Sequence, residues 1–501
     1  MTGDKGLKQN AVSFVSSVVI GVASTAPGYS LAAVLGFVVL AGPVGATVGF
    51  QAPAVLLVSF VPMFFIASAY YYMNRADPDC GTTFSWVTKA MGPHLGWLGG
   101  WAIVVADVIV MANLAQIAGL YSFLLVGAEG AAESVFWVTV VGVIWIGIMT
   151  AIVTIGIELS ARTQQFLLGA EVVTLAAFAV IALWKVYVDD FPGSTHIELS
   201  WFSPFAIDSL STLTAGMLLA VFIFWGWDSA VSVNEETEDS SEAPGKSAVV
   251  STVILLLIYV IVAAAALSLD FGTVSDPANS ADVLSVLGTE VFGSPLDKIL
   301  IIAILTSAAA STQTSILPTA RTTLSMARAK AMPKALGNVH PRYLTPHVSS
   351  ILMGVLSIVW YVGLTIVSEN ILFDSLAALG LMIAFYLGLN GFACAIYYRR
   401  ELFRNVKTFL FVGVAPLIGA AILFYLLGKN AVELADPANS ESGDSWLGLG
   451  PPLVIAIFFM VLGVVLMFWQ QATSPEFFRR KLEVAPPDLV ARAPATDGKE
   501  S

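Results

Sequence analysis

The sequence predicts an all-α polytopic membrane protein with twelve transmembrane helices. Of its 501 residues, 57 % are hydrophobic and only 12 % are charged, whereas a soluble protein carries about 25 % charged residues. A helix of about 20 apolar residues is long enough to cross a bilayer. Segments of that length number twelve and fall at roughly residues 11–41, 46–72, 96–126, 134–157, 165–188, 208–233, 247–269, 296–325, 348–367, 373–398, 408–428 and 451–471.

The basic residues are sorted between alternate loops, and this sorting predicts the orientation of the chain. With twelve spans and the N-terminus inside, only Lys185, Lys298 and Lys429 fall on the outer side. The other twenty of the 23 basic residues fall on the inner side. We therefore expect a multi-pass protein of the plasma (inner) membrane with both termini in the cytoplasm.

The spans divide the chain into four parts. We expect a cytoplasmic N-terminus, a ten-helix core, two additional helices and a disordered cytoplasmic tail, at residues 1–10, 11–398, 399–471 and 472–501. The outer loops 270–295 and 429–450 are rich in Asp, Asn, Ser and Pro and are predicted to be solvated connectors. The remaining loops are too short for a soluble enzyme or signalling domain.

Several classes of site are excluded by composition and spacing. The two cysteines, Cys80 and Cys394, are too few for a disulfide framework. The four histidines form no cluster with metal-ligand spacing, and neither a phosphate-binding glycine loop nor a nucleophile elbow is present. The net charge of −12 argues against nucleic acid as a partner. We expect no cofactor and no enzymatic activity, and the lipid bilayer as the surrounding medium.

The first span is interrupted near its centre. It carries no charge from residue 11 to 41, yet its middle reads Gly21-Val22-Ala23-Ser24-Thr25-Ala26-Pro27-Gly28-Tyr29. Proline lacks an N–H donor and disfavours helix at the residue before it, so we predict that the helix opens near Ala23–Gly28. Freed backbone groups at this depth bind substrates or ions in transporters. The alternative is a simple proline kink that neighbouring helices stabilise.

A second interruption lies about 200 residues later, in the sixth span, which reads Phe224-Trp225-Gly226-Trp227-Asp228-Ser229. Spans one and six are the first members of two five-span halves. Breaks at matching positions of two such halves predict a 5+5 inverted repeat, in which the halves have opposite orientations in the membrane and the binding site lies between the breaks. A carboxylate in a span costs several kcal/mol unless it faces water or a partner. Asp228, with Trp225 and Trp227, is therefore a candidate for substrate binding. The alternative is that the helix ends before Asp228 and residues 234–239 begin a solvated loop.

Three other spans carry polar candidates. Asp107 lies in the middle of the third span and is assigned to the substrate site, on the helix face opposite Gln116. Glu171 lies nine residues beyond Arg162, about 13 Å deep in a helix. It could take up and release a proton, or be a buried structural group. The eighth span could bind sodium, or simply pack closely, through Ser311, Thr312, Thr314 and Ser315.

Four stretches together resemble the amino acid–polyamine–organocation superfamily, in its amino acid permease branch. The resemblance extends over spans one to ten, and spans eleven and twelve fit the family less distinctively. The four stretches are the break at Gly21–Gly28; Asp77–Trp86 followed by Gly92-Pro93 and Gly99-Gly100-Trp101; Gly226-Trp227-Asp228 leading to Asn234–Thr237; and Arg328–Lys334 continuing to His340-Pro341 and Thr345-Pro346.

The resemblance implies a leucine-transporter-like fold, with the substrate amine and carboxylate bound at the breaks of spans one and six. It also implies coupling to protons, sodium or exchange. The sequence departs from the family at two places. The Gly-Ser-Gly-like break common in the family is replaced by Thr25-Ala26-Pro27, which has one N–H donor fewer. A span-five lysine that replaces sodium in a proton-coupled branch corresponds here to Glu171.

The leading expectation is a secondary active transporter that takes up an amino acid or a related amine by alternating access. Glu171 is expected to couple uptake to protons. One alternative is a polyamine or amine transporter, in which Asp107, Glu171 and Asp228 would bind ammonium groups. Another is an amino acid exchanger, and sodium coupling remains open because spans one and eight both carry hydroxyl residues.

Overall fold

The computed structural model describes residues 5–43, 45–280 and 282–486. In this part of the chain, twelve spans are long and apolar enough to cross a membrane, which confirms the predicted number. They are Phe14–Leu40, Gly49–Ala76, Pro93–Val126, Val135–Ile155, Ile157–Tyr187, Leu210–Ser232, Ala243–Leu269, Lys298–Arg328, His347–Val367, Asn370–Tyr397, Val406–Glu433 and Pro451–Thr473.

Two spans are assembled from separate pieces of helix, as predicted. The first consists of α1 (Phe14–Ser24) and α2 (Pro27–Leu40). The sixth consists of α9 (Leu210–Ala220), a 3-10 turn (Phe222–Phe224) and α10 (Ser229–Ser232). The other helices are α3 (Ala52–Ala76), α4 (Thr83–Met91), α5 (Pro93–Val126), α6 (Glu129–Ala132), α7 (Val135–Ile155), α8 (Ile157–Tyr187), α11 (Ala243–Leu269), α12 (Phe271–Val274), α13 (Val283–Phe292), α14 (Lys298–Arg328), α15 (His347–Val367), α16 (Glu369–Tyr397), α17 (Val406–Thr408), α18 (Ala415–Glu433) and α19 (Pro451–Thr473).

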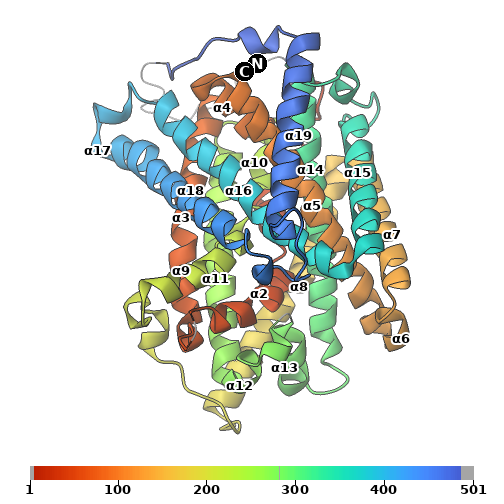
Figure 1. The fold of residues 1–501 in the computed structure, drawn as a ribbon, viewed down its shortest axis with the longest axis vertical. Helices are drawn as coiled ribbons and strands as arrows, with labels where there is room; N and C mark the ends of the chain where they lie inside the picture. The colour runs from red at the N-terminus through yellow and green to blue at the C-terminus, as the bar shows by residue number, and fades with distance from the viewer. Residues whose placement is uncertain (1–4, 44, 281, 487–501) are drawn as a thin grey trace, which may run out of the picture.

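The helices run along one long axis, with α4 and the start of the chain at one end and α12 and α13 at the other (Figure 1). We call the first of these the Lys5 end. Lys185 and Lys298 lie at the opposite end, where their ammonium groups donate to the carbonyls of Glu290 and Leu125. Within the described residues no β-strand is formed.

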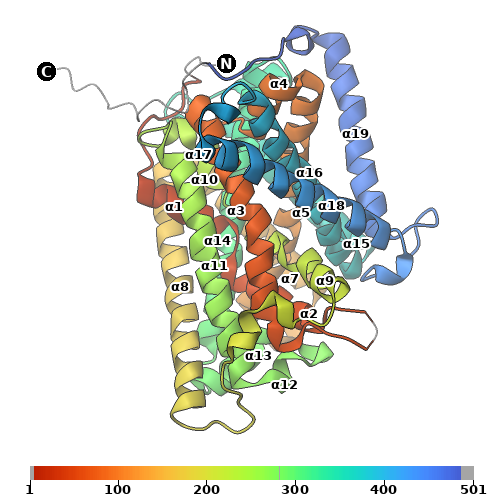
Figure 2. The same cartoon turned by 90° about the vertical axis from the view of Figure 1, so that its left-hand side faces the viewer.

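Helices α5 and α14 form the centre of the bundle. In the most apolar stretch of α5, 89 % of the residues are buried, against 28 % in α7 and α19. Figure 2 shows α8 and α19 at opposite edges of the molecule. The outer helices expose large apolar side chains such as Phe136, Trp137 and Phe458. These positions suit contact with lipid, which is as apolar as the side chains.

Small residues let the central helices approach closely. A Cβ on Gly119 of α5 would lie 2.3 Å from the carbonyl oxygen of Val138 in α7. A Cβ on Gly142 would lie 2.6 Å from the carbonyl oxygen of Ala115. Association of helices in membranes depends on such backbone approach, because lipid offers no hydrophobic driving force between them.

Two sequence-based boundaries need correction. The fifth span begins at Ile157 and not at 165, because its early polar residues face another helix: Gln164 Nε2 donates to Gln313 Oε1 of α14 at 2.8 Å. The outer loop 270–295 is not a solvated connector throughout. It contains α13, whose apolar face, formed by Val283, Leu284, Leu287 and Val291, is buried. Of the predicted tail, residues 487–501 lie outside the described part of the chain.

Candidate functional site

The first span is interrupted at Thr25 and Ala26, between α1 and α2. The break is shorter than the predicted Ala23–Gly28, because Ala23 and Ser24 still complete the last turn of α1. Ala26 has a φ of 47°, a left-handed conformation that costs an L-residue about 1–2 kcal/mol. Pro27 then starts α2, where its lack of an N–H has no cost.

The sixth span is opened from Trp225 to Asp228. Ser229, predicted to lie within this break, is already the first residue of α10. Helix therefore resumes directly after Asp228. The first part of the acidic stretch that follows is not a solvated loop, since Asn234 and Glu236 are fully buried, whereas Glu238 and Asp239 are exposed.

The two breaks are in contact with each other. Gly226 has a φ of 120°, and a Cβ on it would lie 2.8 Å from the carbonyl carbon and oxygen of Ser24. The hydroxyls of Ser24 and Ser229 are hydrogen-bonded at 2.8 Å. Glycine permits both the backbone conformation and the close approach. The open ends of spans one and six thus form a single site.

Replacing Gly226 by alanine is expected to destabilise the protein by about 1–3 kcal/mol, because the new methyl group would overlap the Ser24 backbone. Thermal unfolding of the purified protein would measure this. Gly147→Ala is the matched control, since a Cβ on this helical glycine meets no atom within 4 Å. Equal melting temperatures for the two variants would contradict the prediction.

Asp228 lies at the centre of the second break with a single side-chain partner. Its Oδ2 accepts a hydrogen bond from the Tyr386 hydroxyl of α16 at 2.9 Å, and the Trp225 indole donates to the same hydroxyl. Asp228 is 7 % exposed, and within the described residues no Lys, Arg or His pairs with it. The break therefore holds a buried acidic group that no basic side chain of residues 5–43, 45–280 and 282–486 neutralises.

The two tryptophans beside Gly226 have different surroundings. Trp225 is half-buried and joins the Tyr386–Asp228 hydrogen bonds. Trp227 is fully buried and packs edge-to-face on Tyr70 of α3, with ring centroids 5.0 Å apart. Its indole N–H has no hydrogen-bond partner among the described residues. Of the two indoles, Trp225 is the one placed beside the carboxylate.

Asp107 of α5 is buried next to this assembly. It accepts a hydrogen bond from Thr319 of α14 and interacts electrostatically with Asp228. Gln116 is directed elsewhere, accepting from Tyr361 of α15 at 2.6 Å. The two polar residues of this span therefore have separate partners, as their helical spacing predicted.

Glu171 of α8 meets the first break. Its Oε1 accepts the backbone N–H of Gly28, the second residue of α2, at 2.6 Å. The side chain is fully buried, and Oε2 has no hydrogen-bond partner among the described residues. Glu171 therefore bonds the break with one oxygen, and the Ser307 hydroxyl of α14 is a further polar group at its carboxyl.

The four hydroxyls of span eight that were proposed as sodium ligands divide into two groups. Ser311 reaches out of its helix and donates to the carbonyl of Ser24 at 2.8 Å. The others donate to carbonyls one turn earlier in α14, as Thr312, Thr314 and Ser315 do. One of the four proposed sodium ligands is therefore directed at the break, while three satisfy the helix backbone.

Sequence reasoning missed Tyr386 and Thr319, which bind the two aspartates, and Tyr259, which donates to the carbonyl of Ile223 at 2.7 Å. In the sequence, these residues stand out only weakly, as hydroxyl-bearing side chains in otherwise apolar spans. Buried hydroxyls need hydrogen-bond partners, so they were eligible for the site. Their spacing along the chain does not say which acceptor they reach.

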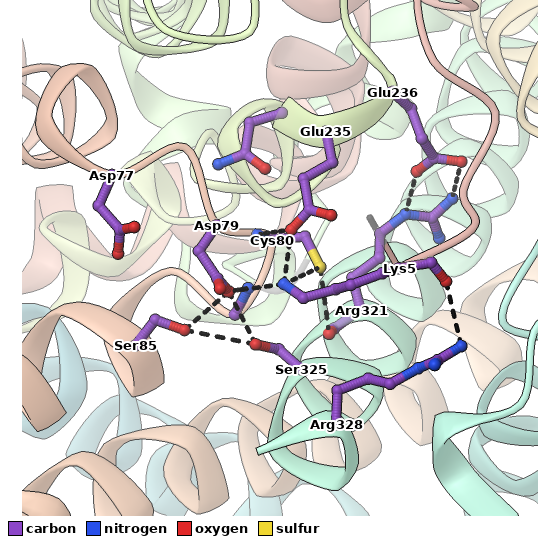
Figure 3. A network of polar contacts seen from close by, with 12 residues as sticks. Lys5, Asp77, Asp79, Cys80, Ser85, Glu235, Glu236, Arg321, Ser325 and Arg328 are labelled. Atoms are coloured by element: carbon purple, nitrogen blue, oxygen red, sulfur yellow. Dashed lines mark hydrogen bonds and ion pairs between the residues drawn. The ribbon is translucent and has the colours of Figure 1, made fainter. Parts of the chain in front are cut away.

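A second polar cluster closes the Lys5 end (Figure 3). The Lys5 ammonium lies 2.9 Å from Asp79, 2.5 Å from Glu235 and 3.5 Å from the Cys80 sulfur. Burial alone would raise the pKa of Asp79. The charge of Lys5 and the hydrogen bonds from Ser325 and Ser85 outweigh burial and lower this pKa to about 2. The three groups around Lys5 could hold a metal ion by their spacing, but the ammonium lies among them.

Next to Lys5 lies a fully buried ion pair (Figure 3). Arg321 of α14 binds Glu236 through two parallel hydrogen bonds of 2.6 and 3.0 Å, and both side chains are inaccessible to solvent. The backbone N–H groups of Ala11 and Val12 donate to the carbonyl of Glu236. The segment from Lys5 to Val12 is thereby tied across the ends of spans two, six and eight.

Comparison with known proteins agrees with this architecture. The amino acid permease family model matches residues 10–475. The low-affinity putrescine importer PlaP of Escherichia coli (strain K12) is 22 % identical over 338 residues, 66 % of this chain and 71 % of the relative. The methylthioribose transporter of Bacillus subtilis (strain 168) is 22 % identical over 420 residues, 78 % of this chain and 84 % of the relative.

A third relative, the branched-chain amino acid permease BcaP of Bacillus subtilis (strain 168), is 22 % identical over 416 residues, 78 % of this chain and 83 % of the relative. The family match includes all twelve spans, and the proteins it relates are membrane transporters and not enzymes. The chain belongs to the amino acid permease family of the amino acid–polyamine–organocation superfamily.

Proposed function

We propose that this permease takes up an amino acid or a related amine across the plasma membrane, with the substrate bound between the breaks of spans one and six. In this proposal the ten-helix core is a leucine-transporter-like 5+5 inverted repeat that works by alternating access. The Lys5 end faces the cytoplasm, which agrees with the sorting of twenty basic residues against three.

The observation that carries the proposal is the buried carboxylate of Asp228, with which no Lys, Arg or His in the described part of the chain pairs. A lone charge in a span costs several kcal/mol, and a substrate ammonium would supply the missing charge. Trp225 adds an indole face beside it, and a cation over such a face gains about 0.5–2 kcal/mol. The Asp228 carboxylate and the Trp225 indole both belong to the break in span six. Residues that contact the substrate are therefore the ones about which this span would move.

Proton coupling is proposed through Glu171. Its Oε1 accepts the Gly28 N–H whether the carboxyl is charged or neutral, and Oε2 is the free position for a proton. Protonation at Oε2 removes a negative charge from the site without breaking the bond to the first span. A change of charge that depends on an external proton is what a symporter needs.

Two alternatives have support of their own. Asp107 and Asp228 interact electrostatically, so the site carries two acidic groups, which favours a diamine or polyamine. The Ser311 hydroxyl bonds the Ser24 carbonyl, and both are oxygen ligands of the kind that sodium binds. The putrescine importer among the relatives supports the first alternative.

The Glu171→Gln variant tests proton coupling. Uptake by the wild type is expected to rise as the external pH falls and to be the same with and without sodium. The glutamine side chain cannot be charged or protonated in this range, so uptake by the variant should be low and independent of pH. Both proteins would be reconstituted in vesicles and assayed across external pH, with sodium or potassium outside.

The Ser311→Ala variant is the matched control, because it removes the span-eight hydroxyl that donates to the Ser24 carbonyl at the end of α1. It should keep the pH dependence of the wild type. Wild-type uptake that requires sodium and ignores pH would overturn the coupling proposal, and so would a full pH dependence in Glu171→Gln.

A further inference from the structure

The first break has no free N–H group for an anion. Pro27 has none, the Gly28 N–H is bonded to Glu171, and the Tyr29 N–H is bonded to the Ser307 hydroxyl at 3.2 Å. The N–H groups of Thr25 and Ala26 are bonded to carbonyls at the end of α1. Every backbone donor from residue 25 to 29 is therefore absent or already used.

The start of a helix such as α2, with 14 residues, is a natural place for an anion. Its first N–H groups lack partners within the helix, and the helix dipole favours negative charge there. In this chain the anion at that place is a side chain, the carboxyl group of Glu171. Gly28 allows the approach, since a Cβ on it would lie only 3.2 Å from Glu171 Oε1.

The second break does not offer a better place for a substrate carboxylate. A carboxylate bound at residues 226–228 would share this break with the Asp228 carboxyl group, with which no Lys, Arg or His of the described residues pairs. A carboxylate bound here would meet like charge in a site of low dielectric, which is strongly unfavourable. Charge at both breaks thus favours a cation and disfavours an anion.

We propose that Glu171 occupies the position of a substrate carboxylate, and that this permease selects amines that lack a carboxylate over the amino acids that match them. The inference rests on the proposed function and specifies its substrate class. The substrate is a primary amine or diamine whose ammonium pairs with Asp228. Glu171 is a specificity-determining residue, in addition to its proposed part in proton coupling.

Two variants separate the role of Glu171 in substrate specificity from its role in proton coupling. In Glu171→Gln the amide oxygen still accepts the Gly28 N–H, so the anion position stays filled while the protonation site is lost. In Glu171→Ala the Gly28 N–H is released and a substrate carboxylate can reach it. Selectivity should therefore follow the bond to Gly28, and pH dependence should follow the carboxyl group.

The experiment uses pairs of compounds that differ only by the carboxylate: putrescine against ornithine, and 3-methylbutylamine against leucine. Affinities would be measured with the purified full-length wild type and both variants, by ligand-induced thermal shifts and by competition. We expect the wild type and Glu171→Gln to bind each amine at least about 10-fold more tightly than its amino acid, one hydrogen bond to a charged group being enough for that factor. In Glu171→Ala the ratio should fall toward one.

The outcomes are distinct. Amino acids that bind the wild type as tightly as the matching amines would overturn this inference but leave the proposed transport function standing. A preference for amines that survives in Glu171→Ala would also overturn it, since the selectivity would then not depend on Glu171. No binding of any of the four compounds would contradict the proposed function itself.

Discussion

Replacing Asp228 by asparagine is expected to weaken amine binding by about 10- to 100-fold, because a charge-assisted hydrogen bond contributes about 1.5–3 kcal/mol. The change removes the charge and keeps the shape of the side chain. The melting temperature of the ligand-free protein should not fall, since the variant no longer buries an unpaired carboxylate. A loss of binding without a loss of stability is typical of a residue that serves the ligand.

Binding would be measured by competition and by ligand-induced thermal shifts, with uptake in vesicles as a second readout. Tyr386→Phe is the matched control, because it removes one hydrogen bond to Asp228 and leaves the charge. Its effect should stay below about 10-fold. If Asp228→Asn bound and transported amines as the wild type does, the substrate site would have to lie elsewhere.

The second large effect is expected at the Lys5 end. Arg321→Met should lower the free energy of unfolding by about 3–5 kcal/mol, because Glu236 would remain buried without its partner. The methionine side chain fills similar space, so loss of packing contributes little. Thermal unfolding of the purified protein would show a clearly lower melting temperature.

Two controls accompany this variant. Lys330→Met breaks an exposed ion pair, that of Lys330 with Glu476, with side chains 53 % and 65 % exposed, and should leave the melting temperature unchanged. Arg321→Met combined with Glu236→Gln removes the uncompensated charge and should recover part of the lost stability. A melting temperature for Arg321→Met equal to that of Lys330→Met would show that the buried pair does not stabilise the fold.

The number and type of helices could be predicted because the bilayer imposes a length and a composition on each span. The breaks could be predicted because proline and glycine act locally on the backbone. The extent of the breaks could not be predicted, since Ser24 and Ser229 are helical residues that bond each other across the two spans, and Ser24 also accepts from Ser311 of α14. Helix α13 was missed because its buried face is short and lies within a polar loop.

The candidate site was predictable where a residue is costly in its own span, as for Asp228, Asp107 and Glu171. It was not predictable where the role depends on a partner from another helix. Tyr386 shows this, because a tyrosine in an apolar span is common and its acceptor lies on span six. From the sequence, Glu236 was predicted to lie in a solvated loop and Arg321 at the end of a span. Their buried ion pair was not predictable, because it depends on contact between two distant segments.

The segment that begins at Lys5 has a consequence for following the movement of this permease. Cys80 lies beneath it, fully buried, and burial raises the pKa of its thiol, so the nucleophilic thiolate is scarce. Cys394 of α16, the other cysteine of the chain, is buried with its sulfur 3.6 Å from the carbonyl of Val412, in the π-helical segment Phe409–Val414 that precedes α18. Cys80 packs between Leu7 of this segment and Leu324 of α14, so lifting the segment would expose the thiol to a reagent. The unlabelled wild-type protein therefore carries its own reporter of opening at this end, read as a rate of alkylation.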